Sequence, residues 1–441
     1  MAQDEDRPGV GFWGAVAIGV GGMVGGGIFA VLGLSVKLTR GAAPLAFALA
    51  GLVALVTAWS YARLSVAYPS QGGTVTFLYK AYGPGLFTGA ANVLLWISYI
   101  IMLSLYAHAF GSYGAQLFAP GHRGLWTHAL ISAVIILVTL LNMFSVKAIG
   151  AAERWIVAIK VLILTGFVVL GMAGMSVHRL APSQWAGWLP VVAGGMVIFV
   201  AYEGFELIAN SAEDVSDPRR TLPRAYYTCV GFVIVLYIAV AAVTLGNLSV
   251  DGIVAAKDYA LAEAARPFLG ESGYLVITIA ALLSTTSAIN ATLYGAARLS
   301  YVIARDGELP SFLERRIWNR PLEGLLITAV LTLVMANAFD LSNISTMGST
   351  GFLLIFAAVN AAHARMGAGS RFKTAMAWGG AGLCLLALAS LLVETAMRSP
   401  AQLWVLVAML GLALGIEVIY RGVSRRGIRM DTDTGDVPGG P

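Results

Sequence analysis

The stretch Gly19-Val-Gly-Gly-Met-Val-Gly-Gly-Gly27 places six glycines among nine residues, in the middle of the first apolar run of the chain. Each glycine weakens a helix by about 1 kcal/mol relative to alanine. Close packing of two helices through small residues needs two glycines on one face, and it gives no reason for three in succession. The stretch therefore predicts a membrane helix that unwinds near its middle, with close packing as the alternative. Backbone groups freed by such a break are tolerable inside a membrane only where they line a cavity.

The composition around this stretch indicates a membrane protein. The chain has 441 residues, of which 58% are hydrophobic and 12% are charged, and its mean hydropathy is +0.79. Soluble domains carry about 25% charged residues, so this chain has too few to cover a surface that faces water. Apolar runs recur from Val10 to Tyr420 without a polar stretch long enough for a separate domain. We therefore expect one all-α integral membrane domain with short tails.

Twelve segments have the length and apolar character of a transmembrane helix, which needs about 20 residues. The ninth and tenth segments are the least clearly divided, because only Asp340 and a short polar patch separate them, and merging them would give eleven segments. The predicted spans cover residues 10–36, 42–67, 86–118, 125–146, 152–175, 187–212, 223–246, 271–304, 323–339, 341–363, 375–396 and 401–421.

Basic residues give these spans a direction. With a cytoplasmic N-terminus, eighteen of the 28 lysines and arginines fall on the cytoplasmic side and seven on the other side. The remaining three, Arg63, Lys160 and Arg298, lie within spans. This bias follows the positive-inside rule and predicts that both termini are cytoplasmic. It also explains the net charge of +5 without a nucleic-acid partner.

The segments outside the spans have distinct compositions. Residues 1–9 lack the basic region and cleavage site of a signal peptide, and we expect a cytoplasmic tail. Residues 249–270 mix polar and apolar positions at helical spacing and predict a short helix on the outer side, whereas residues 306–322 predict a basic amphipathic segment on the inner side. Residues 422–441 have little to bury and predict a disordered cytoplasmic tail.

A second interruption lies in the sixth span, where Phe199-Val-Ala-Tyr-Glu-Gly-Phe-Glu206 contains two carboxylates and a glycine. A charged carboxylate near the bilayer centre costs on the order of 3 kcal/mol. Glu203 and Glu206 are therefore either functional or structural groups hydrogen-bonded to a neighbouring helix. The interruption comes five spans after the first one. If two five-helix halves are inverted repeats, both interruptions occupy corresponding positions, which is the pattern of a transporter site at mid-membrane.

The chemistry of two broken helices favours a zwitterionic substrate. The amino end of a half-helix offers amide groups to an anion, and the carbonyl end of its partner attracts a cation. An ammonium next to a carboxylate matches that pairing. The sequence therefore favours an α-amino acid over a sugar or a lone ion.

Lys160 is the third unusual residue. It lies six residues beyond Arg154 in the fifth span, so roughly 9 Å into the helix. A lysine at this depth can extend its ammonium to the interface. Alternatively, it is buried and loses and regains a proton, with carbonyls of the first helix and the hydroxyls of Ser284-Thr-Thr-Ser287 as partners. Hydroxyl side chains in membrane helices also bond their own backbone, which leaves a structural role for these residues open.

Five segments carry a resemblance to a known family. They are GGGIF (25–29), AYEGFE (201–206), NSAEDVSDPRRTLPRA (210–225), SAINATLYGAARLSYVIARDGELP (287–310) and LERRIWNRPLEGL (313–325). Together they resemble the amino acid–polyamine–organocation (APC) superfamily, most closely its ApcT-type proton-coupled amino-acid permeases. The resemblance implies a LeuT-like fold, with a ten-helix core of two inverted five-helix repeats over residues 10–363 and two peripheral helices within residues 375–421.

The resemblance also implies a binding site. Backbone amides of the glycine run would hold the substrate carboxylate, and backbone carbonyls of both broken helices would hold the ammonium. The implied amides are those of Gly25, Gly26 and Gly27, and the implied carbonyls are those of Met23, Val200, Ala201 and Glu203. Separately from the resemblance, Tyr99, Tyr106, Tyr202 and Glu206 are candidates for the wall of the pocket.

The resemblance further implies that Lys160 occupies the place of sodium in sodium-coupled relatives, with Ser284 and Ser287 near it and Gly21 and Val24 as its backbone partners. Glu203 departs from the family pattern, because many relatives carry an apolar residue there. This carboxylate would favour cationic side chains or provide a second proton site.

These observations predict a multi-pass transporter of the plasma membrane that imports amino acids by proton symport and alternating access, without sodium. An exchanger, or a carrier for cationic amino acids or polyamines, is the alternative. We expect that the protein is not an enzyme and that it has no catalytic residue, metal or cofactor, because the five histidines lie apart and neither an HExxH nor a GxxxxGK[ST] motif occurs. We also expect no ATP and no obligatory protein partner, only substrate, proton and lipid.

Overall fold

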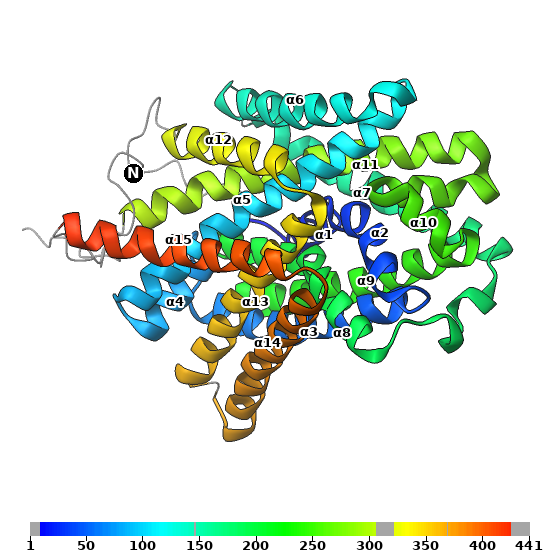
Figure 1. Ribbon diagram of the computed structural model, residues 1–441. Helices are drawn as coiled ribbons and strands as arrows, with labels where there is room; N and C mark the ends of the chain where they lie inside the picture. The colour runs from blue at the N-terminus through cyan, green and yellow to red at the C-terminus, as the bar shows by residue number, and fades with distance from the viewer. Residues whose placement is uncertain (1–8, 145–146, 306–321, 368, 425–441) are drawn as a thin grey trace, which may run out of the picture.

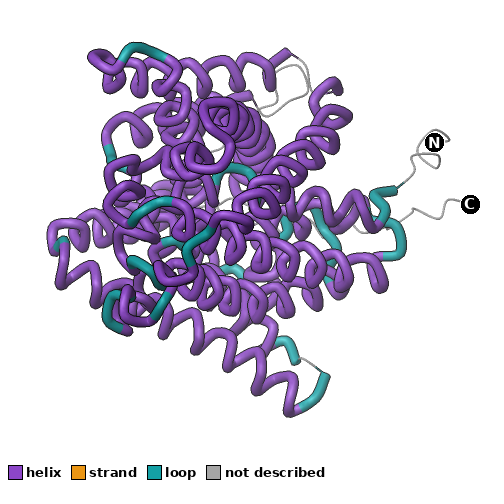
Figure 2. Tube along the Cα trace, turned by 90° about the vertical axis from the view of Figure 1, so that its right-hand side faces the viewer, coloured by secondary structure: helices purple, strands orange, loops and turns teal. Residues whose placement is uncertain are grey.

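Helices make up nearly all of the chain that the computed structural model describes, which is residues 9–144, 147–305, 322–367 and 369–424, and short loops join them (Figures 1 and 2). The α-helices are α1 (Phe12–Met23), α2 (Gly27–Thr39), α3 (Ala43–Ala67), α4 (Thr74–Tyr82), α5 (Leu86–Gly114), α6 (Arg123–Phe144), α7 (Lys147–Gly171), α8 (Trp188–Val197), α9 (Pro218–Asn247), α10 (Val250–Ala256), α11 (Ala260–Arg305), α12 (Leu322–Ala338), α13 (Leu341–Arg365), α14 (Arg371–Arg398) and α15 (Pro400–Ser424).

Several 3₁₀ segments supplement them. The longest is η6 (Phe199–Asp214), which continues α8, and η7 (Lys257–Tyr259) joins α10 to α11. The predicted amphipathic segment at 306–322 lies outside the described residues except for its last residue, as do most of the two predicted tails.

The apolar helices identify a multi-pass membrane protein. Within the described part of the chain, ten helical stretches are long and apolar enough to cross a membrane, and the bent pair α1–α2 brings the number to eleven. The helix α12 is apolar but has only 17 residues. The predicted count of twelve is therefore not confirmed by length and composition.

Burial separates central from peripheral helices. In the most apolar part of the α8–η6 stretch 94% of the residues are buried, against 22% in α15. Large apolar side chains on the outer helices, such as Leu162, Leu386 and Trp404, are mostly exposed, as lipid-facing residues of a membrane protein are. Figure 1 shows α6 and α12 along one edge of the molecule, α14 along the opposite edge and α1 between them.

The helices α1 and η6 lie side by side at the centre. Both pack against α9, which in turn packs against α3. The long helix α5 contacts α11 and α13. The first and sixth predicted spans are therefore neighbours, although residues 37–186 separate them in the chain.

The predicted short helix at 249–270 consists of three parts, α10, η7 and the first ten residues of α11. The helix α11 is kinked at Gly270, which has φ +63°. Glycine adopts this left-handed conformation without a steric penalty. The second half of α11 begins at this kink and corresponds to the predicted span 271–304.

Candidate functional site

The first span is broken where the glycine run predicts. The helix α1 ends at Met23, α2 begins at Gly27, and their axes differ by 43°. Between them the Gly25 amide donates to the Gly22 carbonyl over 3.3 Å. The first turn of any helix leaves its amides without partners inside that helix. The break therefore presents the amino end of α2 and the carbonyl end of α1 at one place.

The sixth span is not unwound in the same way. It changes from α-helix to 3₁₀-helix after Val197 and continues through the predicted interruption. The carbonyl of Val197 accepts hydrogen bonds from Ser345 Oγ at 2.7 Å and Ser349 Oγ at 2.8 Å. The Val200 amide donates to Ser349 Oγ at 3.0 Å. Two serines of α13 thus satisfy the groups that the change of helix type releases.

These serines were missed by the sequence analysis. They lie four residues apart, so they share one face of α13. That spacing within an apolar helix was the signal that could have singled them out. Which backbone groups they meet depends on how α13 packs against α8 and η6.

Glycines also allow α1 and η6 to touch through their backbones. A Cβ atom on Gly204 would lie 2.2 Å from the carbonyl carbon of Gly22, and one on Gly27 would lie 2.8 Å from the Cα of Ala201. Real Cβ atoms do not come this close to backbone. The two interpretations of the glycine run therefore both apply, because the run breaks the helix and also packs it closely.

Lys160 is buried at the carbonyl end of α1. Its side chain is 1% exposed, and its Nζ donates to the carbonyl of Gly21 over 2.9 Å. Ser284 of α11 donates to the carbonyl of Val24 over 2.6 Å. The structure therefore brings Gly21, Val24, Lys160 and Ser284 together, from the end of α1, α7 and α11, and the lysine is buried inside the protein.

The two threonines of the Ser284–Ser287 run have local roles. Thr285 donates to Ala281 and Leu282 carbonyls and Thr286 to the Leu282 carbonyl, all within α11. Ser287 is also largely buried, with 8% of its surface exposed. Bonding to the helix's own backbone thus accounts for both threonines and not for Ser284.

Two of the predicted substrate carbonyls meet at a tyrosine. The Tyr237 hydroxyl of α9 donates to the Met23 carbonyl over 2.6 Å and lies 3.3 Å from the Ala201 carbonyl. The sequence analysis missed Tyr237, because a tyrosine in an apolar helix is common and only the fold places it between α1 and η6. Its hydroxyl stands where a donor to both carbonyls is needed.

The ring of Tyr106 on α5 packs against Gly26. A Cβ atom added to Gly26 would lie 2.3 Å from the nearest carbon of this ring. Its hydroxyl lies 3.4 Å from the Gly22 carbonyl and 3.3 Å from Glu203 Oε1. This tyrosine therefore links both central helices and packs against the break at Gly26.

The two carboxylates share one face of η6, because side chains three residues apart are aligned in a 3₁₀-helix. Glu203 and Glu206 are both 1% exposed. Glu206 Oε2 accepts from the Tyr61 hydroxyl at 3.2 Å. Within the described part of the chain, Glu203 Oε2 is buried without a hydrogen-bond partner. Glu203 thus has one oxygen that could accept a further hydrogen bond.

The remaining predicted wall residues, Tyr202 and Tyr99, have hydrogen-bond partners within the protein. The Tyr202 hydroxyl donates to the Phe47 carbonyl of α3 over 3.0 Å. The Tyr99 hydroxyl accepts from Asn210 Nδ2 at 3.2 Å.

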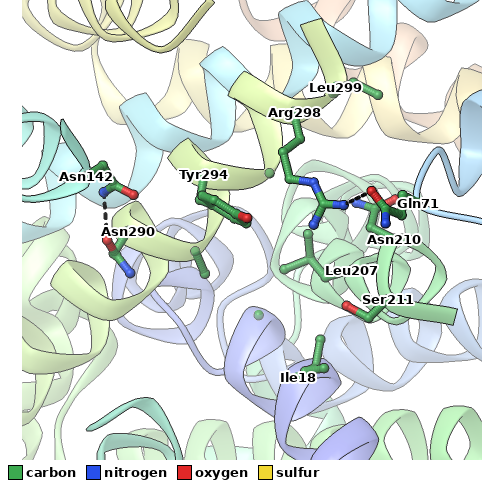
Figure 3. A pocket seen from close by; sticks show the side chains of 13 residues that line it. Ile18, Gln71, Asn142, Leu207, Asn210, Ser211, Asn290, Tyr294, Arg298 and Leu299 are labelled. Carbon is green, nitrogen blue, oxygen red and sulfur yellow. Dashed lines mark hydrogen bonds between the residues drawn. The ribbon is translucent and has the colours of Figure 1, made fainter. Parts of the chain in front are cut away.

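A cavity of about 300 Å³ lies beside this region (Figure 3). It reaches Gly22, the next-to-last residue of α1, and extends along η6 and the part of α11 that follows the kink at Gly270. Several of its residues lie within segments 210–225 and 287–310, which carry the resemblance, but of the side chains shown there only Arg298 was named individually from the sequence. The lining residues are Ile18, Gly22, Gln71, Asn142, Leu207, Asn210, Ser211, Asn290, Ala291, Tyr294, Gly295, Arg298 and Leu299.

Comparison with known proteins gives a consistent result. The profile of the family described as "Amino acid permease" matches residues 10–414. The inner membrane transport protein YbaT of Escherichia coli is 35% identical over 358 residues, which cover 79% of this chain and 82% of YbaT. A methylthioribose transporter of Bacillus subtilis is 27% identical over 366 residues, and this matched region covers 78% of each chain. The chloroplastic cationic amino acid transporter 9 of Arabidopsis thaliana is 28% identical over 69% of this chain and 57% of its own.

Proposed function

The chain belongs to the amino acid permease family, and on that premise we propose that it is a secondary active transporter that imports amino acids with protons by alternating access. The three relatives described above are transporters by name. The proposal includes a LeuT-like arrangement of twelve membrane helices, with an inverted-repeat core over residues 10–363 and peripheral helices within 375–421. The adjacent position of the first and sixth spans supports this arrangement.

One observation carries the proposed substrate site. The carbonyl end of α1 and the start of η6 turn the Met23 and Ala201 carbonyls toward one hydroxyl, that of Tyr237. An ammonium group is a donor that both carbonyls can accept, so it would replace the tyrosine there. The amides of Gly25, Gly26 and Gly27 would then receive the carboxylate after the Tyr106 ring moves aside. A zwitterion would thus complete both ends of the broken helix.

Proton coupling is assigned to Lys160. Its ammonium donates to Gly21 and lies in the same region as the bond between Ser284 and Val24. A protonated lysine stabilises the packing of α7 and α11 on α1, and its deprotonation would remove a charge-assisted hydrogen bond at this junction. In this proposal the charge also stands where a sodium ion would bind, so transport is independent of sodium.

The proposal places the protein in the plasma membrane with both termini in the cytoplasm, as the distribution of basic residues predicts. It requires no ATP, metal, cofactor or obligatory protein partner.

A carrier for cationic amino acids or polyamines is a second candidate, favoured by Glu203. This buried carboxylate has an oxygen without a partner in the described residues and lies next to the predicted site. One relative is named as a cationic amino acid transporter. A cationic side chain would supply the missing donor.

Uptake by the purified protein in proteoliposomes tests both candidates. Radiolabelled neutral and cationic amino acids are offered under an inward proton gradient, an inward sodium gradient, or neither. Proton symport predicts accumulation with the proton gradient alone. Uptake that instead requires vesicles preloaded with unlabelled amino acid would identify an exchanger, and uptake driven by sodium would refute the assigned role of Lys160.

A further inference from the structure

The cavity of Figure 3 contains a charged group that the proposed transport site does not use. Among the described residues that line it, Arg298 of α11 is the one charged side chain. It reaches across the cavity, and its Nη2 donates to Oε1 of Gln71. Its guanidinium carbon lies 5.6 Å from the centre of the Tyr294 ring. Both of these partners are neutral.

A neutral amide uses little of what a guanidinium offers. Arginine has five N–H donors in a planar fork, and a carboxylate accepts two of them in parallel. The bond to Gln71 is already assisted by the charge of the guanidinium, but the amide oxygen carries no charge and accepts a single N–H. A carboxylate adds its own charge and a second parallel hydrogen bond, so a carboxylate that enters the cavity would compete with Gln71 for Arg298.

The rest of the cavity suits a small polar solute. Asn210 and Ser211 of η6 lie on the side of Gln71, and Asn142 Nδ2 donates to Asn290 Oδ1 over 2.7 Å at the other end. These side chains are neutral and can both donate and accept. The volume of about 300 Å³ is at the lower end of small-molecule sites, which span roughly 300–1,000 Å³.

The position of the cavity connects it with the break in α1. Its inner end is at Gly22, where a Cβ atom would meet the Gly204 carbonyl at 2.7 Å and Leu207 Cδ1 at 2.9 Å. The cavity therefore adjoins the end of α1 at the contact between α1 and η6. A solute that leaves the break on this side would enter the cavity directly.

We propose that this cavity is a second, transient site for the substrate. In this site the substrate carboxylate replaces Gln71 as the partner of Arg298. The inference rests on the proposed function, because it takes an amino acid as the cargo. Arg298 would then receive the carboxylate that the glycine amides give up, and the solute would never expose an unpaired negative charge to the apolar wall of Ile18 and Leu207.

Site-directed labelling of the purified full-length chain tests this proposal. Ser211→Cys places a thiol in the cavity, and its rate of reaction with N-ethylmaleimide is measured. The unsubstituted chain is the background control, because Cys229 and Cys384 are both buried. The probes are propionate, its amide propionamide, L-alanine and inorganic phosphate. Propionate lacks the ammonium that the proposed transport site needs, so it reports on the cavity alone.

We expect propionate and L-alanine to slow labelling several-fold, and propionamide to have no effect. Arg298→Gln should abolish the protection, whereas Arg298→Lys, which keeps the charge but not the planar fork, should retain part of it. Arg63→Gln is the matched control, since this arginine of α3 does not line the cavity. Monodisperse elution and an unchanged melting temperature establish that each variant is folded.

Equal protection by propionate and propionamide would overturn the proposal, and so would protection that persists in Arg298→Gln. Arg298-dependent protection by phosphate but not by either carboxylate would also overturn it, because the cavity would then bind phosphate or a lipid headgroup. Uptake in proteoliposomes without any protection would reject this site alone. Protection without uptake of any amino acid would support a carboxylate site and reject the proposed function.

Discussion

At the scale of single residues, Lys160 is the group whose position most restricts the mechanism. A charged lysine inside a membrane domain costs free energy, and such residues mark functional sites. The hydrogen bond to Gly21 explains where the charge is stabilised. It does so at the end of α1 that must move if the substrate site opens and closes.

We predict that Lys160→Ala abolishes the stimulation of uptake by a proton gradient. The alanine has no proton to exchange and leaves the Gly21 carbonyl without this donor. Uptake in proteoliposomes with and without a pH gradient measures the effect, and Arg63→Ala provides another basic residue of a membrane helix as a control. Stimulation of the same size in Lys160→Ala would show that the proton uses another group.

Tyr237 permits a prediction with an unusual sign. If the substrate ammonium replaces its hydroxyl, Tyr237→Phe removes a competitor for the Met23 and Ala201 carbonyls. The substrate-free protein then loses about 1–3 kcal/mol of stability, and the substrate binds more tightly, by about tenfold for each 1.4 kcal/mol regained.

Melting temperatures and equilibrium binding measure these two effects. Tyr202→Phe is the matched control, because its hydroxyl also donates to a carbonyl, that of Phe47 in α3. It should lower stability without tightening binding. Weaker binding by Tyr237→Phe would indicate that this hydroxyl contacts the substrate or orients the carbonyls.

At the scale of elements, the central pair α1 and η6 depends on two glycines that meet back to back. We predict that Gly204→Ala lowers stability strongly, because its methyl group would lie 2.2 Å from the Gly22 carbonyl carbon and the helices cannot separate without disturbing both broken regions. Overpacking of this kind typically costs about 1–3 kcal/mol and occasionally more.

Gly231→Ala in α9 is the matched control, since no atom lies within 4 Å of its added methyl group. There alanine should be neutral or stabilise the helix by up to about 1 kcal/mol. Thermal unfolding in detergent compares the two variants. Equal melting temperatures would show that α1 and η6 are not in close contact in the folded protein.

The junction of α8 and η6 makes a prediction about two serines of α13. Ser345→Ala should cost little, because Ser349 still donates to the Val197 carbonyl. Ser349→Ala should cost about 1–3 kcal/mol, since it also leaves the Val200 amide without its partner. The double variant should lose more than the sum of the two, as expected for groups that share one acceptor.

Melting temperatures of the two single variants and the double variant measure this coupling. Ser390→Ala, on an exposed position of α14 where the hydroxyl donates to its own helix, is a suitable control. Additive losses would mean that the two serines act independently of the Val197 carbonyl.

At the scale of the whole molecule, substrate binding should be visible as global stability. A ligand that binds only the folded state at 100 times its Kd stabilises that state by about 2.7 kcal/mol. We predict that at least one amino acid raises the melting temperature of the purified protein. The corresponding amide and the decarboxylated amine should have no such effect, because each lacks the carboxylate for which the glycine amides are proposed.

A screen of all amino acids and of common polyamines measures this effect. Stabilisation by polyamines, or by arginine and lysine alone, would favour the cationic carrier and a role for Glu203. Stabilisation by no amino acid would contradict the proposed substrate class.

The sequence was sufficient for conclusions that depend on local composition and spacing. Apolar runs of sufficient length predict membrane helices because lipid excludes unpaired backbone groups. Consecutive glycines predict the break between Met23 and Gly27 because each removes helix stability locally. These are properties of short segments, and the fold had little room to change them. The number of spans was harder to predict, because α12 is near the lower limit of length.

The tertiary structure decided everything that depends on which distant segments meet. It places the Tyr237 hydroxyl between the Met23 and Ala201 carbonyls, and Ser345 and Ser349 at the end of α8, although each pairing joins residues far apart in the chain. It also decides that Lys160 faces α1 and that Arg298 crosses a cavity. The physical reason is that a backbone carbonyl has no identity in the sequence. Which side chain satisfies it is fixed only when helices pack and every buried polar group must find a partner.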